Sequence, residues 1–141
     1  MANKFGLIEA SNADVVMSYT VKDRDINNLI EAGYVAKYTG NGETIELASG
    51  LTLAEDNFKI AGVVCGISRQ KTKTGRFTQD VVIQGGVIAC KYVGSGTLVA
   101  GSIAYLDSTG AITDSNTSGV IIGKAVRASN NDLGIAYIRI M

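Results

Sequence analysis

The residue types that most often carry enzyme chemistry are scarce in this chain. It has no histidine, so the sequence offers no imidazole base and no Ser-His-Asp or Cys-His pair. Its two cysteines, Cys65 and Cys90, stand in the apolar runs AGVVCGI and GVIACKY, where a thiol usually behaves as a small buried hydrophobe. We therefore expect two buried free thiols rather than a disulfide, and two thiols without histidine do not support a tetrahedral zinc site.

Two short stretches have the outline of ligand-binding loops but lack their key residues. GSGTLVAG at 94–101 is rich in glycine, yet it has neither the Lys-Ser/Thr ending nor the strand-loop-helix setting of a phosphate loop, which favours a tight turn. DSTGAITDSN carries Asp107, Ser108 and Asp114 without calcium-loop spacing or a final bidentate Glu, so we interpret it as a solvated turn. We predict no cofactor and no metal. In an enzyme of the small trimeric β type, Asp80 and Asp107 would be the first carboxylates to test.

Charge is distributed unevenly along the chain. Residues 1–56 contain nine acids and four bases, whereas residues 57–79 contain five bases and no acid. Within the second stretch, SRQKTKTGRFTQD places basic residues on both sides of a predicted hairpin tip at Thr74–Gly75. A soluble hairpin whose lysines discourage edge-to-edge aggregation explains this pattern, and so does a contact arm that reaches an acidic surface on a neighbouring subunit or a larger partner. The candidate contact residues of this hairpin are Arg69, Lys71, Lys73 and Arg76.

The N-terminal stretch from Met1 to about Val21 is a second candidate for contact. It carries isolated apolar residues without a clean repeat, among them Phe5, Leu7 and Ile8. Terminal segments are commonly disordered until they are tied down. We therefore name these three residues as candidate partner contacts, because binding to a partner would order the segment.

Composition limits the partners that suit the chain. Only 18% of its 141 residues are charged, against about 25% in a typical soluble domain, and its mean hydropathy is +0.19, which indicates that some apolar surface meets a partner. Thirteen basic and thirteen acidic residues cancel, which disfavours a general binder of nucleic acid or of anionic membranes. The sequence has no run of about 18 apolar residues and no signal-like N-terminus, so we expect a soluble protein made in a cytoplasm.

Short segments rich in Val, Ile and Tyr, bounded by Gly, Asn, Asp or Ser, dominate the rest of the sequence. Such segments are typical of strands joined by tight turns. Because proline is absent, turns with a positive φ must rely mainly on the 17 glycines. KDRDINNLIEAG predicts one short helix, with Asp23 as its cap, Ile26, Leu29 and Ile30 on one face, and Gly33 as its terminator. The predicted fold class is all-β, a compact small barrel or sandwich with a hairpin arm and an extended N-terminal segment.

Two parts of the sequence share one register. LIEAGYVAKYTGNGETIELASG aligns with TLVAGSIAYLDSTGAITDSN at a numbering offset of 68, and the later segments IAGVV and IIGKAV repeat at an offset of 61. Chance reuse of turn residues would give some of these identities, but four in one register favour a duplicated unit. We predict an arm or short helix-containing segment over 1–29 and a single β domain over 30–141, built of two related halves at about 30–68 and 86–141 that the basic hairpin joins. The identities are Ala32 with Ala100, Gly33 with Gly101, Ala36 with Ala104 and Gly42 with Gly110.

The second half, LVAGSIAYLDSTGAITDSNTSGVIIGKAV followed by GIAYIRIM, resembles the capsid cement, or decoration, proteins of tailed bacteriophages. In that family a glycine stands at the start of a strand, which has the pattern apolar-Tyr-apolar-Asp. A hairpin glycine, a polar loop, an apolar-Gly-apolar strand and a closing strand complete the unit. AGYVAKYTGNGETIELA with FKIAGVV looks like the family's first half, so the resemblance covers about residues 30–141. The long basic hairpin and the extended N-terminus depart from the shorter members. The matching positions are Gly101, residues 104–107, Gly110, residues 115–119, residues 122–124 and residues 137–140.

The resemblance implies a compact β-rich module, commonly a homotrimer, on the outside of an icosahedral shell. The implied function is that of a non-enzymatic structural virion protein, which binds the outside of a phage capsid and stabilises it by bridging capsid subunits. Its partners would be the major capsid protein of a tailed phage and other copies of itself, with no direct nucleic acid and no membrane. Its location would be the capsid exterior, after synthesis in the bacterial host cytoplasm.

An alternative function from the residues is a β-domain that binds a glycan or a small ligand, such as a host-attachment module. Six tyrosines keep this alternative open. Tryptophan is absent and only 6% of the residues are aromatic, whereas platforms that stack on sugars usually need exposed rings.

Overall fold

The computed structural model describes residues 5–9, 15–39, 44–50, 59–65, 69–71 and 76–140. The described residues form strands and two single-turn 3-10 segments, η1 (Lys22–Arg24) and η2 (Ile26–Asn28), and no α-helix, which confirms the all-β prediction. The strands are β1 (Gly6–Glu9), β2 (Val15–Val21), β3 (Val35–Tyr38), β4 (Thr44–Leu47), β5 (Ile60–Val64), β6 (Arg69–Lys71), β7 (Arg76–Lys91), β8 (Ile103–Leu106), β9 (Ile112–Thr113), β10 (Ile121–Ala125) and β11 (Ile135–Ile140).

The predicted short helix is wrong. Asp23 does not cap a helix; it lies inside η1 with a left-handed φ of 57°. The Asp and Asn side chains of this segment bind its backbone instead, as when Asp25 Oδ1 accepts the N–H of Asn27 at 2.9 Å. At Ile30 the backbone N–H and C=O are both taken by the buried amide of Gln79, at 2.8 and 2.5 Å. Gln79, which lies far from Ile30 in the sequence, thus takes the place of the backbone partners that Ile30 would have in a helix. The spacing of apolar residues around Ile30 cannot reveal this contact.

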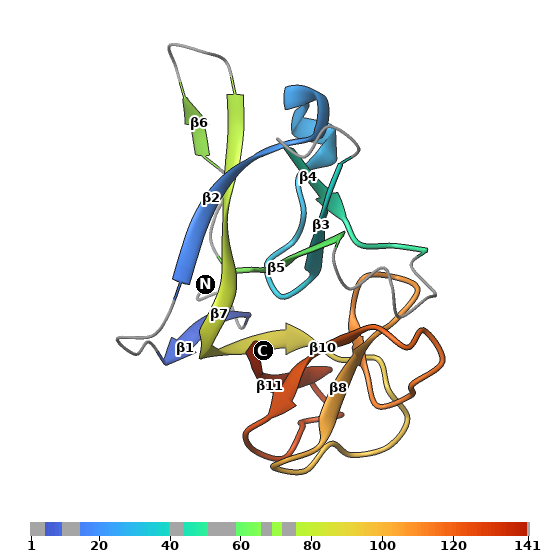
Figure 1. Ribbon diagram of the computed structural model, residues 1–141. Helices are drawn as coiled ribbons and strands as arrows, with labels where there is room; N and C mark the ends of the chain where they lie inside the picture. Colours follow the sequence, from blue (N-terminus) through green and yellow to red (C-terminus); the bar gives the residue numbers. More distant parts are fainter. Residues whose placement is uncertain are drawn as a thin grey trace.

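Five strands close into a barrel, shown in the upper part of Figure 1. In order these are β2, β4, β3, β5 and the first half of β7, which returns to pair with β2. The β2–β4 pair is parallel and short, with Thr20 opposite Thr44 and Val21 opposite Ile45. Aliphatic and small side chains fill the interior, so the barrel has a packed core rather than a channel. They are Ile30, Ala36, Ile45, Ala61, Val64 and Val81.

The second half of β7 begins a second group of strands. It pairs with β11, which is followed across the sheet by β10, β8 and β9. A parallel bridge between Tyr92 and Ile112 brings the last strand back to the end of β7, and the N–H of Val93 donates to the carbonyl of Ile112 at 2.9 Å. The same five-strand order as in the upper barrel therefore recurs in the lower group, which lies below the barrel in Figure 1.

β7 belongs to both groups and bends between them, as Figure 1 shows. Gly85 and Gly86 lie at the bend with φ values of 74° and 64°, a conformation that other residues adopt only at a cost. The wall formed by β3, β5 and β7 is buried on both faces. Val64 and Val81 belong to the upper core, whereas their neighbours Val63 and Val82 pack in one cluster with the lower strands. The two groups are therefore joined by a common hydrophobic core.

The two groups repeat the same hydrogen bonds at fixed offsets. Gly33 N–H donates to the carbonyl of Val64 at 2.8 Å, and in the second group Gly101 N–H donates to the carbonyl of Ala125 at the same distance. The two donors differ by 68 in numbering and the two acceptors by 61. Ala36 lies opposite Gly62, just as Ala104 lies opposite Gly123. The offsets of 68 and 61 that align the sequence therefore also align the strand pairings.

The correspondence extends to two strands that the sequence alignment does not include. Cys65 N–H donates to the carbonyl of Asp80 at 2.9 Å and Val126 N–H to that of Tyr137 at 3.0 Å, so β11 matches the first half of β7 at an offset of 57. The pair of Met17 with Val81 matches that of Ile88 with Ile138, so the second half of β7 matches β2 at an offset of 71. Structurally, one unit runs from β2 to the bend in β7, and the next from that bend to β11.

Candidate interaction surfaces

β6 and the start of β7 form a two-stranded hairpin at the upper end of the molecule (Figure 1). β6 pairs with the start of β7, with Lys71 opposite Arg76 and Arg69 opposite Thr78. Three of the four predicted basic residues therefore lie within three consecutive positions of a two-stranded ladder. Lys73 and the predicted tip at Thr74–Gly75 lie outside the described residues, as do the side chains of the other three.

Part of the N-terminal stretch is fixed within the chain itself. Leu7 and Ile8 lie in β1, which pairs with the second half of β7 and places Leu7 opposite Ile88; their side chains lie outside the described residues. Phe5 is half-buried, and its ring covers Gly33 so closely that an added Cβ would lie 2.8 Å from Phe5 Cγ. Residues 5–9 are therefore held by contacts within the chain, and the prediction that Phe5, Leu7 and Ile8 contact a partner stays a prediction.

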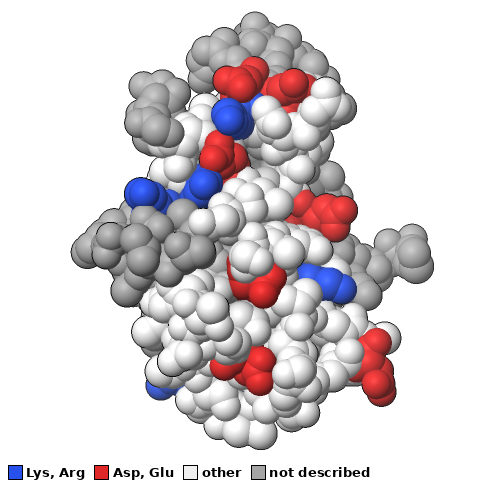
Figure 2. Space-filling view, turned by 90° about the vertical axis from the view of Figure 1, so that its right-hand side faces the viewer, with Lys and Arg blue, Asp and Glu red and all other residues white. Residues whose placement is uncertain are grey.

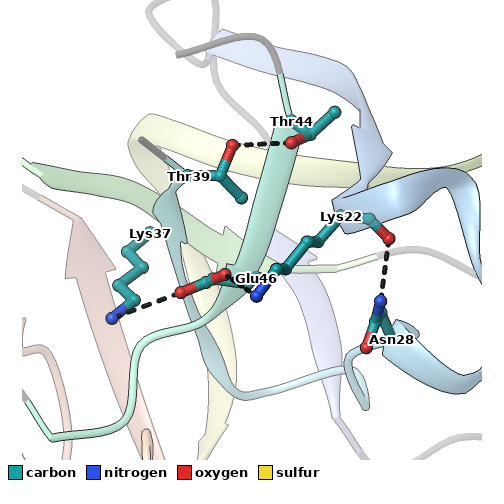
Figure 3. A network of polar contacts seen from close by, with 6 residues as sticks. All are labelled: Lys22, Asn28, Lys37, Thr39, Thr44 and Glu46. Carbon is teal, nitrogen blue, oxygen red and sulfur yellow. Dashed lines mark hydrogen bonds and ion pairs between the residues drawn. The ribbon is translucent and has the colours of Figure 1, made fainter. Parts of the chain in front are cut away.

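Glu46 carries a polar network at the closure of the upper barrel (Figure 3). Its Oε1 lies 3.4 Å from Lys37 Nζ, and its Oε2 lies 3.5 Å from Lys22 Nζ. Lys37 is in β3, Glu46 is in β4 and Lys22 follows β2, so one carboxylate links three strands. Nearby, the hydroxyls of Thr39 and Thr44 share a hydrogen bond of 2.6 Å. These groups are partly exposed and already bonded to one another, which indicates that they hold neighbouring strands together rather than form a reactive site.

In the lower group, Asp114 occupies the position that matches Glu46 at the offset of 68, and it accepts hydrogen bonds there. Its Oδ2 accepts the N–H of Gly96 at 3.2 Å, and the hydroxyl of Tyr92 donates to the carbonyl of Gly96. Burial of Tyr92, followed by the nearby Asp114 carboxylate, raises the pKa of this phenol to about 12. Tyr92 therefore stays protonated near neutral pH, where it stabilises the closure.

Both cysteines are free, but they are not equally buried. Cys90 is fully buried, as predicted, and burial raises the pKa of its thiol. Cys65 is only half-buried, so the prediction of two buried thiols is wrong for this residue; its Sγ lies 3.6 Å from the carbonyl oxygen of Asp80. Burial, and then the charge of Asp80, raises its pKa too. Neither thiol has the lowered pKa of a reactive cysteine.

The two carboxylates considered for catalysis are each bonded to a neighbouring hydroxyl. Asp80, in the upper barrel, accepts the hydroxyl of Ser18 at 2.6 Å. Asp107, in the lower group, accepts the N–H and the hydroxyl of Thr109 at 3.0 and 2.6 Å, and its carbonyl accepts the N–H of Gly110 at 3.0 Å in the predicted turn. Within the described ranges, no three His, Cys, Asp or Glu residues are grouped to hold a metal ion, and no helix could cross a membrane.

One hollow of about 200 Å³ lies beside the turn between β8 and β9. Its hydroxyl groups are partly used within the fold, since Ser118 Oγ donates to the carbonyl of Leu106 at 2.7 Å and the hydroxyls of Ser115 and Thr117 share a bond of 2.7 Å. No aromatic side chain lines it. Its polar lining consists of Asp107, Ser108, Thr113, Ser115, Thr117 and Ser118.

Large apolar side chains are exposed at several places on the described surface. Figure 2 shows a face on which charges of both signs are scattered over a mostly uncharged surface, without a continuous patch of one sign. Two of the exposed residues, Val16 and Met17, are consecutive in β2. The others are Leu47, Val93, Val99, Ile103, Ile121 and Leu133.

Comparison with known proteins adds no relative to this picture. The chain matches no protein-family model, and no curated protein matches its sequence. Its function therefore has to be argued from the surfaces described above.

Proposed function

We propose that the chain is a non-enzymatic structural protein that binds the outside of a phage capsid and bridges its subunits. One observation carries the proposal: the described chain has two packed five-strand groups that expose large apolar side chains, while its candidate reactive groups are bonded within the fold. Such a molecule is suited to work through its surfaces, and the adjacent exposed residues Val16 and Met17 form the kind of apolar surface at which contacts are made. The sequence resemblance to capsid cement proteins points in the same direction.

The mechanism we propose is stabilisation by linkage. A protein that binds the assembled shell but not the separated subunits shifts the equilibrium towards assembly by mass action. A homotrimer would add avidity, because three modest contacts on one particle act at a high effective concentration. The connection between the two groups through β7 would let a bound molecule transmit force between its contacts.

The basic arm is the proposed electrostatic contact with acidic surface on the major capsid protein or on a neighbouring copy. Each exposed ion pair is expected to contribute about 0.2 to 1 kcal/mol, so single substitutions should have small effects. Four substitutions together should weaken binding and reduce its dependence on salt.

Co-sedimentation with purified phage shells tests the proposal. We expect the wild-type chain to sediment with shells, and a variant with Arg69, Lys71, Lys73 and Arg76 changed to serine to do so less strongly at low salt. The double variants Arg69→Ser/Lys71→Ser and Lys124→Ser/Arg139→Ser provide a matched pair, since each removes two cations, the first from the arm and the second from exposed positions of the lower group. A wild-type chain that never sediments with shells would refute the capsid role.

A glycan-binding or host-attachment role is the second candidate, and the hydroxyl-lined hollow beside β9 is the observation in its favour. The absence of an aromatic ring in that lining weakens it, because sugar sites usually include a stacking face. A glycan-array screen, run alongside the shell assay, separates the two functions.

A further inference from the structure

The two matching units differ in what covers their first strand. In the lower unit, Ile88 of β7 pairs with Ile138 of β11 on one side and with Leu7 of β1 on the other, so this strand lies between two neighbours. In the upper unit, the matching residue Met17 of β2 pairs with Val81 of β7. On its other side β2 meets β4 only at Thr20 and Val21, and no other described strand pairs with it.

Burial follows the same difference. The three lower residues that β1 covers, Val87, Ile88 and Ala89, are exposed by 2%, 0% and 0%. Their matches at the offset of 71 are Val16, Met17 and Ser18, of which Val16 is 43% and Met17 is 45% exposed. Consecutive residues of a strand point to opposite faces. Because Val16 and Met17 are both exposed, this part of β2 is partly open to solvent on both faces.

We propose that the outer edge of β2 at Val16–Ser18 is an acceptor site for a β-strand, and that an extended segment of a capsid subunit binds there antiparallel to β2. The register is the one that β1 uses on β7, with Leu7 opposite Ile88. An apolar residue of the donor is therefore expected opposite Met17. The identity of the donor rests on the proposed function, whereas the acceptor edge rests on the repeat alone.

This edge lacks the side chains that usually prevent strand addition. Exposed edges in soluble proteins are commonly protected by Lys, Pro, a bulge or a covering loop. The β2 sequence VVMSYTV contains no charged residue and no proline. The pairing of β2 with β7 shifts register only between Val15 and Val16, so residues 16–18 form a regular ladder. Main-chain hydrogen bonds to such an edge give affinity, and side chains at alternate positions give selectivity.

A second copy of this chain is a less suitable donor than a different protein. Its β1 strand already pairs with its own β7. If β1 moved to β2 of a neighbour, it would uncover an equivalent apolar edge at Val87–Ala89, so the exchange would bury no additional edge. A capsid subunit that supplies its own extended segment covers the edge of β2 without this loss.

The acceptor edge can be tested without shells. The probe is the synthetic peptide KFGLIEAS, which contains the β1 sequence, added in millimolar amounts to the full-length ¹⁵N-labelled chain. We expect amide shifts centred on Val16, Met17 and Ser18, which disappear when the peptide is N-methylated at alternate backbone amides. No shifts at β2, or equal shifts with the N-methylated peptide, would overturn the acceptor site whatever the protein binds in the virion.

Shell binding tests the donor. Met17→Lys is expected to lower the affinity for shells about tenfold, because the charge would be buried against the added strand. Ala128→Lys is the matched control, since Ala128 is exposed in the lower unit, lies outside β2 and is not one of the exposed large apolar residues. Thermal unfolding checks that each variant folds, and Val16→Lys repeats the test on the other face of β2.

Each outcome of these assays has one meaning. If shells bind Met17→Lys, Val16→Lys and wild type equally, the inferred contact is wrong while the capsid role stands. If shells bind no form of the protein, the capsid role and the capsid donor are both refuted, and the peptide assay alone decides the acceptor edge. If the isolated chain forms a dimer that Met17→Lys dissociates and Ala128→Lys does not, the occupant is a second copy and our choice of donor is wrong.

Discussion

The equivalence of the two units can be tested at a pair of glycines that occupy matching positions. An added Cβ at Gly62 would collide with the carbonyl oxygen of Val82 and lie 2.8 Å from Val81 Cγ1. At Gly123 it would collide with the carbonyl oxygen of Arg139 and lie 2.9 Å from Ile138 Cγ2. In both units the obstacle is the backbone of the neighbouring strand, which cannot rotate away as a flexible side chain can.

The expected cost of alanine follows from these contacts. Forcing one carbon into a packed site costs about 1 to 3 kcal/mol, and the φ of 149° at Gly62 adds strain of about 1 kcal/mol or more. Replacing glycine by alanine also stabilises the fold by about 0.5 to 1 kcal/mol, because the unfolded chain then has less conformational freedom to lose. We expect Gly123→Ala to destabilise the fold by about 1 to 2 kcal/mol and Gly62→Ala by about 2 to 4 kcal/mol.

Gly101→Ala provides the control, because Gly101 has a φ of 93° but nothing within 4 Å of an added Cβ. Its cost should reflect backbone strain alone and remain at about 1 kcal/mol or less. The assay is denaturant unfolding followed by circular dichroism. The same single transition should shift in both Gly62→Ala and Gly123→Ala, because one hydrophobic cluster contains Val63 and Val82 as well as Ile122 and Ile138. Two separate transitions, each sensitive to one variant, would refute a common core, and a cost for Gly123→Ala no larger than for Gly101→Ala would refute the close approach.

Three further predictions follow from the polar groups. Glu46→Gln removes two partly exposed ion pairs and should cost about 0.5 to 1.5 kcal/mol at low salt and less at high salt, as measured by denaturant unfolding; equal costs at both salt concentrations would contradict an ionic contribution. Burial, and then the hydrogen bond of 2.9 Å between the hydroxyls of Tyr19 and Tyr38, raises the pKa of Tyr19 from 10.0 to about 12, and the pKa of Tyr92 is raised equally. The contribution of both tyrosines to stability should therefore be complete below pH 10 and be lost as the pH rises towards 12; a Tyr92→Phe variant that keeps the full wild-type decline would contradict the part assigned to Tyr92. Cys65 should react with a thiol reagent faster than the fully buried Cys90 in the native state, as mass spectrometry after timed labelling would show; equal rates would contradict the difference in burial.

The sequence predicts the fold class and part of the repeat, because turn glycines and short apolar runs are local signals. Gly33 and Gly101 precede matching strands with φ values of 92° and 93°, as their common register indicates. The match between the first half of β7 and β11 is not detectable in the same way. Their offset of 57 differs from those of the earlier strands, and the two segments share strand pairing but only one residue identity, that of Ile83 with Ile140. A continuous 16-residue strand also conceals the boundary between the units at Gly85 and Gly86.

The candidate contacts were predictable only where charge or hydropathy changes along the chain. The basic hairpin follows from a run of cations around a turn, and β6 pairs with β7 there. The exposed Val16 and Met17 fall within the N-terminal stretch, but an apolar pair in a strand normally predicts burial. Among the described strands, β7 pairs along β2 but β4 meets it only at Thr20 and Val21, and such long-range pairing cannot be inferred from local sequence.

The exposure of Val16 and Met17 can be explained by a tandem repeat that has one described strand in front of it. Each unit begins with a strand whose outer edge can accept a neighbour, which gives two equivalent edges, at Val16–Ser18 and at Val87–Ala89. Only one described strand, β1, precedes the repeat, and it covers the second edge. If the proposed acceptor site is correct, the same main-chain geometry that holds β1 in place is used again on β2. A partner that supplies one extended segment would complete in the first unit what the chain already completes in the second.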